Sequence, residues 1–197
     1  MNTNPKRGLV VVLRWGIPVV AIMSLGMIWD TGSSSSFASN VKAPVIDNIS
    51  CDTMEHFKMH IHAHLDILVN GTTYTIPSDV GRIPGQCIYW MHTHDDTGVI
   101  HIESPEKRNF TLGEFFDIWG KNFSNSQIFD NIVSEGDNST LNVYVNGKKV
   151  STENDYINTA INAHDEITIV YGALQESIPQ AYEFPEGMRS TVNGSIV

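Results

Sequence analysis

One segment, KMHIHAHLDILVNG at residues 58–71, constrains the fold more than any other part of the sequence. Successive side chains of a β-strand point to opposite faces, so an extended conformation divides this segment into two sets. The apolar set is Met59, Ile61, Ala63, Leu65, Ile67 and Val69. The polar set is His60, His62, His64 and Asp66. The segment therefore predicts a strand with one face on a core and a row of imidazoles on the other.

Turn signals predict that this strand belongs to a sheet of hairpins. Asn70-Gly71 ends the segment, and Asn146-Gly147 separates LNVYV from KKV. Both dipeptides are typical of two-residue hairpin turns. Residues 95–98, Asp-Asp-Thr-Gly, separate IYWMHTH from VIHIES and predict a third hairpin. The segment EITIVYG at 166–172 predicts a last strand.

One helix is predicted in TLGEFFDIWGKNF at residues 111–123. Thr111 followed by Glu114 has the spacing of a capping box, and apolar residues recur at helical spacing after it. Several hairpins with one clear amphipathic helix predict an α+β domain with a mostly antiparallel sheet. The order of the elements also resembles β-grasp domains, which implies nothing about function.

The N-terminus differs from the rest of the chain. Lys6 and Arg7 precede an apolar stretch at residues 8–29 that only Arg14 interrupts. Counted from Trp15, the stretch suits the core of a signal peptide; counted from its first residue, it is long enough to span a membrane. Residues 1–30 are therefore predicted as a signal peptide or a transmembrane anchor, and both alternatives place the rest of the chain outside the cytoplasm.

The remaining chain divides by composition. Residues 31–50 are predicted as a Ser-rich linker, residues 51–172 as a His-rich α+β domain, and residues 173–197 as a surface-hugging or loose tail. The net charge of -10 excludes the basic surface that a nucleic-acid-binding protein needs. Glycosylation sequons are consistent with export. They begin at Asn48, Asn70, Asn109, Asn122, Asn138 and Asn193.

The two cysteines, Cys51 and Cys87, are predicted to form a disulfide, because a pair of cysteines in an oxidising compartment is most simply bridged. Such a bridge would close a long loop and stabilise the fold by about 3–4 kcal/mol. The alternative is that both cysteines are thiolate ligands of a metal.

The histidines carry the strongest functional signal, since seven of the eight lie between His56 and His101. A turn at residues 95–98 sets a register in which His92 lies opposite His101, with His94 close by. Two histidines on one strand and a third on its neighbour form the ligand set of many zinc sites, and copper also accepts three imidazoles. The alternative is a metal-free polar face on which histidines bond to Asp95, Asp96 and Glu103.

The first histidine row adjoins this group if the two strands are neighbours. His60, His62 and His64 cannot all reach one ion from a straight strand, because alternate side chains are about 6.5–7 Å apart. We therefore expect one composite site, with two adjacent metals as an option. His56 could join it from a helical turn, whereas His164 is distant and is predicted as a turn residue.

Two carboxylates share the faces of these histidines. Asp66 lies on the face of the first row, and Glu103 lies on the face of His101. Each is a candidate to orient a ligand imidazole, or to act as a general base on a metal-bound water.

The segments HIHAHLDILVNG, CIYWMHTHDDTGVIHIESP and FTLGEFFDIWG together resemble a family of small exported or membrane-anchored proteins. Its members occur in ammonia-oxidising archaea (Thaumarchaeota) and in some bacteria, and the resemblance covers about residues 51–150. The family has no established activity, so the resemblance implies a location and a lineage. These archaea rely on extracytoplasmic copper proteins, which favours copper over zinc and a copper protein as partner. The chain lacks the ligand order of cupredoxins and the spacings of the cupin motif.

Three functions follow from these features. The first is an extracytoplasmic copper- or zinc-binding protein, in metal handling or as an accessory to a copper enzyme. The second is a hydrolase or hydratase in which a three-histidine metal activates water, with Glu103 or Asp66 as base. The third is a metal-free surface module, held by its disulfide and decorated with glycans. No nucleic-acid partner is expected, and the N-terminal segment is expected to contact the membrane.

Overall fold

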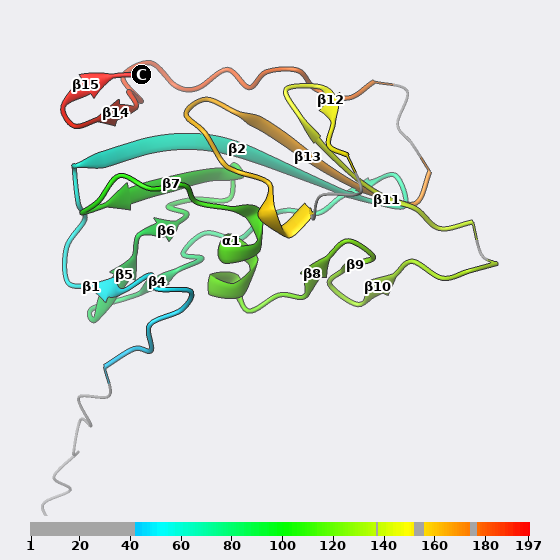
Figure 1. Ribbon diagram of the computed structural model, residues 1–197, viewed down its shortest axis with the longest axis horizontal. Helices are drawn as coiled ribbons and strands as arrows, with labels where there is room; N and C mark the ends of the chain where they lie inside the picture. The colour runs from blue at the N-terminus through cyan, green and yellow to red at the C-terminus, as the bar shows by residue number, and fades with distance from the viewer. Residues whose placement is uncertain (1–41, 137, 152–155, 174–176) are drawn as a thin grey trace, which may run out of the picture. The chain divides into compact units, whose positions relative to one another are not determined.

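The computed structural model describes residues 42–136, 138–151, 156–173 and 177–197, which belong to one compact unit (Figure 1). The predicted signal peptide or anchor in residues 1–30 lies outside the described residues. In the part of the chain that is described, no helix has the length and apolar character needed to cross a membrane.

A nine-stranded sheet organises this unit around one long strand, β2 (Met59–Val69). The main order is β12-β11-β13-β2-β14-β15; β3 and β7 also pair with β2, and β6 pairs with β7. The strands are β3 (Thr72–Thr73), β6 (Met91–His92), β7 (Val99–Ser104), β11 (Leu141–Val145), β12 (Lys148–Lys149), β13 (Glu166–Tyr171), β14 (Thr191–Val192) and β15 (Ser195–Ile196). Strand β13 runs parallel to β2, whereas the other pairings in this sheet are antiparallel.

Two small three-stranded sheets complete the fold. One has the order β1-β5-β4 and the other β10-β9-β8. Their strands are β1 (Cys51–Asp52), β4 (Arg82–Ile83), β5 (Cys87–Tyr89), β8 (Phe123–Ser124), β9 (Gln127–Ile128) and β10 (Asn131–Ile132). The α-helix α1 (Leu112–Trp119) lies below the main sheet in Figure 1, and a 3-10 turn (Tyr156–Asn158) contacts it.

The predicted α+β class is wrong, and so is the β-grasp likeness that went with it. Strand and bridge residues make up 37% of the structure and helix only 7%, so the fold is sheet-rich with one short helix. A single helix of eight residues is too short to form a covering layer. The loops between the predicted strands form further two-residue pairings instead, such as Ser124 with Gln127 across a tight turn.

The helix itself forms as its sequence predicts. The Glu114 backbone N–H bonds to the side chain of Thr111, and the Glu114 carboxylate accepts the Thr111 backbone N–H at 2.8 Å. The helix ends at Gly120, whose positive φ of 67° is a conformation that glycine adopts without strain. Its apolar residues, Leu112, Phe115 and Phe116, are buried in the core with the apolar face of β2.

Both faces of β2 are covered, which the alternating pattern alone does not show. Ile61, Ala63 and Leu65 belong to the core. On the other face His62 and His64 are also buried, because residues 177–190 run along that side of the sheet (Figure 1). Residues 177–197 are therefore not a loose tail.

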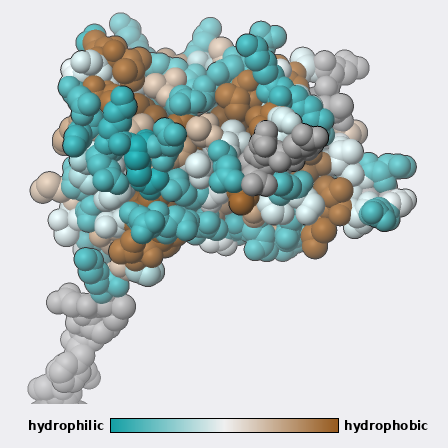
Figure 2. All heavy atoms as spheres, in the orientation of Figure 1, coloured by the Kyte–Doolittle hydropathy of each residue, from teal (hydrophilic) through white to brown (hydrophobic). Residues whose placement is uncertain are grey.

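The folded part also begins earlier than predicted. Residues 31–41 of the expected linker lie outside the described residues, but Ile49 is fully buried and pairs with Ile46. The face in Figure 2 is mostly hydrophilic, with apolar residues in separate patches, as expected for a surface in contact with water.

Candidate metal centre

The register of three neighbouring strands lines up three imidazoles. His62 of β2 lies opposite His101 of β7, and His101 lies opposite His92 of β6. The predicted pairing of His92 with His101 is therefore confirmed, as is the expectation that the two histidine segments are neighbours. His94 follows β6, and its Nε2 lies 3.1 Å from Nε2 of His92.

Four side chains converge at the end of this row. One ligand atom from each of His92, His94, His101 and Glu103 lies within 4.8 Å of the others. The Glu103 carboxylate has Oε2 at 4.0 Å from Nε2 of His92 and Oε1 at 3.7 Å from Nδ1 of His101. We call these four residues the primary group. They provide three nitrogens and a carboxylate in one small volume, a set of donors that suits a transition metal.

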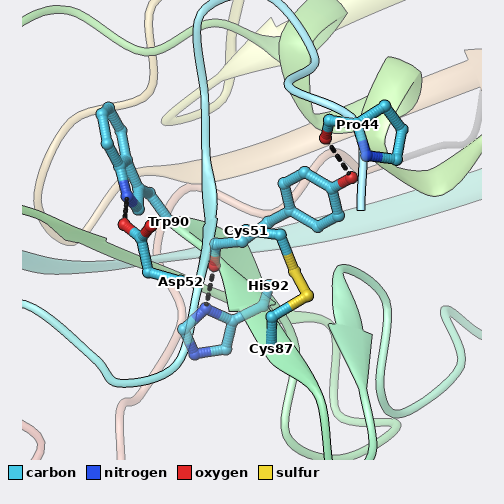
Figure 3. The surroundings of a disulfide bond; sticks show 7 residues. Pro44, Cys51, Asp52, Cys87, Trp90 and His92 are labelled. Carbon is cyan, nitrogen blue, oxygen red and sulfur yellow. Dashed lines mark hydrogen bonds between the residues drawn. A yellow bond between two sulfur atoms is a disulfide. The ribbon is translucent and has the colours of Figure 1, made fainter. Parts of the chain in front are cut away.

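A hydrogen bond to the backbone fixes the orientation of the His92 ring. Its Nδ1–H donates to the carbonyl oxygen of Tyr89 at 2.9 Å, which leaves the lone pair of Nε2 facing His94. Figure 3 shows this bond next to the disulfide. Histidines that ligate metals commonly donate their other ring N–H to a carbonyl or carboxylate in this way.

The structure contains the predicted disulfide between Cys51 and Cys87. This bridge helps to position the same carbonyl of Tyr89. Tyr89 of β5 pairs with Cys51 of β1, so the bridge joins the two strands that position the carbonyl. Because both sulfurs are bridged, the alternative of two thiolate ligands is wrong. The Tyr89 hydroxyl and the Trp90 indole bond to Pro44 and Asp52, which holds this corner further (Figure 3).

Two buried atoms of the primary group have no hydrogen-bond partner among the described residues. They are Nδ1 of His101 and Oε2 of Glu103. Buried polar atoms are almost always hydrogen-bonded, since an unpaired one costs about 1–3 kcal/mol. A metal ion between the four side chains would satisfy both atoms.

Electrostatics keep the primary group in the protonation states that bind metals. Burial lowers the pKa of His92 to about 3, and burial together with His101 lowers the pKa of His94. Burial alone would raise the pKa of Glu103, but the nearby imidazoles of His101, His92 and His60 outweigh it and lower the pKa. At neutral pH His92 and His94 are therefore neutral imidazoles beside an ionised Glu103, which are the states that bind metals.

A second group adjoins the first and shares His101 with it. Ligand atoms of His60, His62 and His101 also lie within 4.8 Å of one another. Nε2 of His60 is 3.2 Å from Oε1 of Glu103. Burial, His101 and His60 lower the pKa of His62 to about 3. The composite arrangement expected from the sequence is therefore present, with His60 and His62 on its edge.

His64 is separate from both groups, although the sequence analysis placed it in the same row. Its Nδ1 lies 2.7 Å from Oε2 of Glu166 and its Nε2 donates to the carbonyl of Thr97 at 2.9 Å. Burial lowers its pKa, but the hydrogen bond and charge of Glu166 outweigh this and raise it. Its ring stacks on Tyr182 at 3.8 Å. Asp66 lies near His64 and Glu166, away from the primary group.

The two remaining histidines lie outside these groups. His56 pairs with Asp52 at 2.9 Å and packs against the edge of Trp90. His164 adopts a left-handed conformation, φ 62°, in the turn before β13, which confirms it as a turn residue.

A cleft of about 380 Å³ opens over the histidines. Its walls are Glu55, His60, His62, His94, His101 and Glu103 on one side and residues 185–189 on the other. The second wall was not predicted, because nothing in the sequence Pro-Glu-Gly-Met-Arg indicates where that segment packs. The buried Ser190 after it accepts the backbone N–H of His62 at 3.1 Å, so this wall is tied to the histidine row.

Comparison of the chain with protein-family models, with curated proteins and with solved structures finds no match in any of the three. Its function is therefore inferred from the side chains that the fold brings together.

Proposed function

We propose that this protein is an extracytoplasmic metal-binding protein that holds copper or zinc in its primary group, His92, His94, His101 and Glu103. The observation that carries the proposal is the convergence of these four side chains, of which His92 and Glu103 are buried, together with two buried ligand atoms that no group in the described part of the chain satisfies. In this role the protein handles metal ions or assists a copper enzyme.

The donor set supports a transition metal. Imidazole nitrogen suits zinc and copper, whereas magnesium and calcium prefer oxygen ligands. Three neutral imidazoles and one carboxylate would leave a dipositive ion with a net charge of +1. The resemblance to proteins of ammonia-oxidising archaea favours copper, and the cleft residue Met188 offers a thioether, a soft donor that suits Cu(I).

The disulfide fits an oxidising compartment outside the cytoplasm. Together with the apolar N-terminal stretch, it supports a protein that is exported or anchored at the outer face of a membrane. A metal-binding protein in that compartment meets copper and zinc without competition from the reduced thiols of the cytoplasm.

The cleft favours a second candidate, a hydrolase or hydratase that uses a metal-activated water. A metal in the primary group would lie next to this open volume, where water and a small substrate have access. Glu55 lines the cleft with Oε1 at 3.8 Å from Nε2 of His94, so it is a candidate base alongside Glu103. Turnover by the metal-loaded protein that Glu55→Gln lowers without loss of metal would support this candidate.

The proposal is tested by metal content. The full chain, produced in an oxidising compartment, is expected to retain at least one equivalent of copper or zinc in elemental analysis. The double substitution His92→Ala with His94→Ala should abolish binding of the primary metal. His164→Asn, at an exposed turn residue outside both histidine groups, is the matched control and should bind like the wild type. Unchanged metal content in the double variant would contradict the proposal.

A further inference from the structure

The Glu103 carboxylate lies between two sets of imidazoles. Its Oε1 faces one side, at 3.2 Å from Nε2 of His60 and 3.7 Å from Nδ1 of His101. Its Oε2 faces the other side, at 4.0 Å from Nε2 of His92, and has no hydrogen-bond partner. The Glu103 side chain is only 4% exposed, so water does not share these contacts freely. One carboxylate thus presents a different oxygen to each set.

His60 and His62 approach each other more closely than a regular strand requires. Alternate side chains on one strand are about 6.5–7 Å apart, but the ring centroids of these two lie 4.8 Å apart. His62 is also 4.6 Å from the ring of His101 across the strand pair. The three rings therefore gather toward one point next to Oε1 of Glu103.

The need to neutralise the charge of Glu103 does not explain why the rings of His60, His62 and His101 lie so close together. His60 and His101 already lie within ion-pair distance of Oε1, at 3.2 Å and 3.7 Å, so Glu103 does not need His62 as a further partner. His62 has no carboxylate within ion-pair distance among the described residues. Imidazole is the commonest metal ligand in proteins, so three rings gathered beside one carboxylate oxygen suit a shared cation.

We propose that a second divalent metal position lies beside the first, held by His60, His62 and Oε1 of Glu103. In this arrangement Oε2 of Glu103 binds the primary metal with His92 and His94, so that the carboxylate bridges two ions. His101 lies between the positions and belongs to both groups. The inference rests on the proposed function, since it shares the carboxylate of the primary group.

The two positions open on the same cleft but differ in their ligands. The primary position has the fully buried His92 besides His94, which lines the cleft with 35% of its side chain exposed; at the second position His60, 26% exposed, and His62 both line the cleft. The second ion therefore faces the cleft, where Arg189 in the opposite wall can attract an anionic ligand. We expect the second ion to bind more weakly and to exchange faster than the primary one, and to provide the open coordination position for a small anion.

Titration of the metal-depleted full chain with Cu²⁺ or Zn²⁺ tests this inference. The wild type should bind two equivalents in two resolved steps, and His60→Ala with His62→Ala should bind one. His64→Gln, on the same face of the same strand, is the matched control and should still bind two. A single equivalent in the wild type that the His60/His62 variant retains would overturn the second position and leave the primary site standing. No binding at all would overturn both.

Paramagnetic resonance of the copper-loaded wild type gives an answer that depends on no substitution. Carboxylate-bridged ions lie about 3.5–4 Å apart, close enough for their unpaired electrons to couple. We expect the two-copper form to show a signal weakened and broadened by coupling, and the one-copper form to show an ordinary isolated Cu²⁺ spectrum. Two equivalents with only uncoupled spectra would contradict the bridge.

Discussion

The histidine face of β2 provides two environments for the same residue type. His62 lies among other imidazoles, with His60 and His101 as neighbours and no carboxylate of its own. His64, the next residue on that face, is paired with its own carboxylate, Glu166, at 2.7 Å. The pKa of His62 is lowered to about 3, whereas the pKa of His64 is raised.

The strand that pairs with β2 at each histidine causes this difference in pKa. On one side β7 brings His101 opposite His62, and on the other side β13 brings Glu166 opposite His64. A neutral imidazole keeps a lone pair for a metal, but an imidazolium that donates from both nitrogens has none. The alternating sequence therefore provides a row of histidines, and the neighbouring strands decide which of them are available as ligands.

The largest effect should come from removing the ligand that the two groups share. We expect His101→Ala to weaken metal binding more than about a hundredfold, because loss of a direct ligand exceeds the 10–100-fold effect of outer contacts. His64→Gln should leave metal affinity within a few-fold of the wild type. Calorimetric titration of both variants measures the contrast, and equal losses would remove the distinction between the two environments.

The next largest effect should be a loss of folding stability when His64 loses its partner, Glu166. We expect Glu166→Gln to lower the free energy of unfolding by about 2 kcal/mol, because His64 loses its charged partner inside the fold. Urea denaturation of the metal-depleted protein measures this loss. Asp130→Asn, at an exposed acidic residue, is the control and should change stability little. A loss that appears only with metal bound would show that Glu166 acts through the metal centre.

The stability of the metal-depleted protein should depend on pH in one sense through His62 and His92 and in the opposite sense through His64. His62 and His92 have folded pKa values of about 3, below the 6.5 of the unfolded chain, so the unfolded state binds more protons as pH falls from 6.5 toward 3. Each should destabilise the fold by about 1 kcal/mol between pH 6.5 and about 5.5. His64 acts in reverse: its contribution is complete below 6.5 and is lost as pH rises through its raised folded pKa.

Denaturation series on both sides of pH 6.5 separate the contributions. His92→Gln should flatten the loss of stability below pH 6.5, and His64→Gln should remove the gain in stability that His64 gives as the pH falls toward 6.5. Parallel pH profiles for the two variants would mean that their environments do not differ in protonation.

The smallest effect should come from the ring that covers His64. Tyr182 stacks on His64 with an interplanar angle of 6°, and we expect Tyr182→Ala to cost about 1 kcal/mol. Tyr182→Phe keeps the ring and should be nearly neutral. Hydrogen exchange at residues 177–184 should quicken in the alanine variant alone; equal exchange in both variants would show that the stack does not hold this segment.

Local patterns predict the local parts of this structure. The alternation of β2, the turn that pairs His92 with His101, and the capping box of Thr111 and Glu114 each depend on residues close in sequence. Each is confirmed because short-range geometry decides it. The helix content was overestimated, since the short pairings of β8–β10 replace helical packing and carry almost no periodic signal of their own.

The parts that the sequence did not predict depend on distant contacts. Glu166 is 102 residues from His64, and Ser190 is 128 residues from His62. Nothing local specifies that β13 runs parallel to β2 or that residues 185–189 form a wall of the cleft. One signal was available: Glu166 opens the otherwise apolar strand EITIVYG, and a carboxylate at such a position needs a partner.

The disulfide beside His92 has a consequence for the timing of maturation. The carbonyl of Tyr89 that fixes the tautomer of His92 lies on the strand that the Cys51–Cys87 bridge fastens. A nascent chain with reduced thiols would lack this fastening, and its His92 ring would be freer to turn away from its neighbours. Under the proposed function, oxidation of the two cysteines would then precede metal loading.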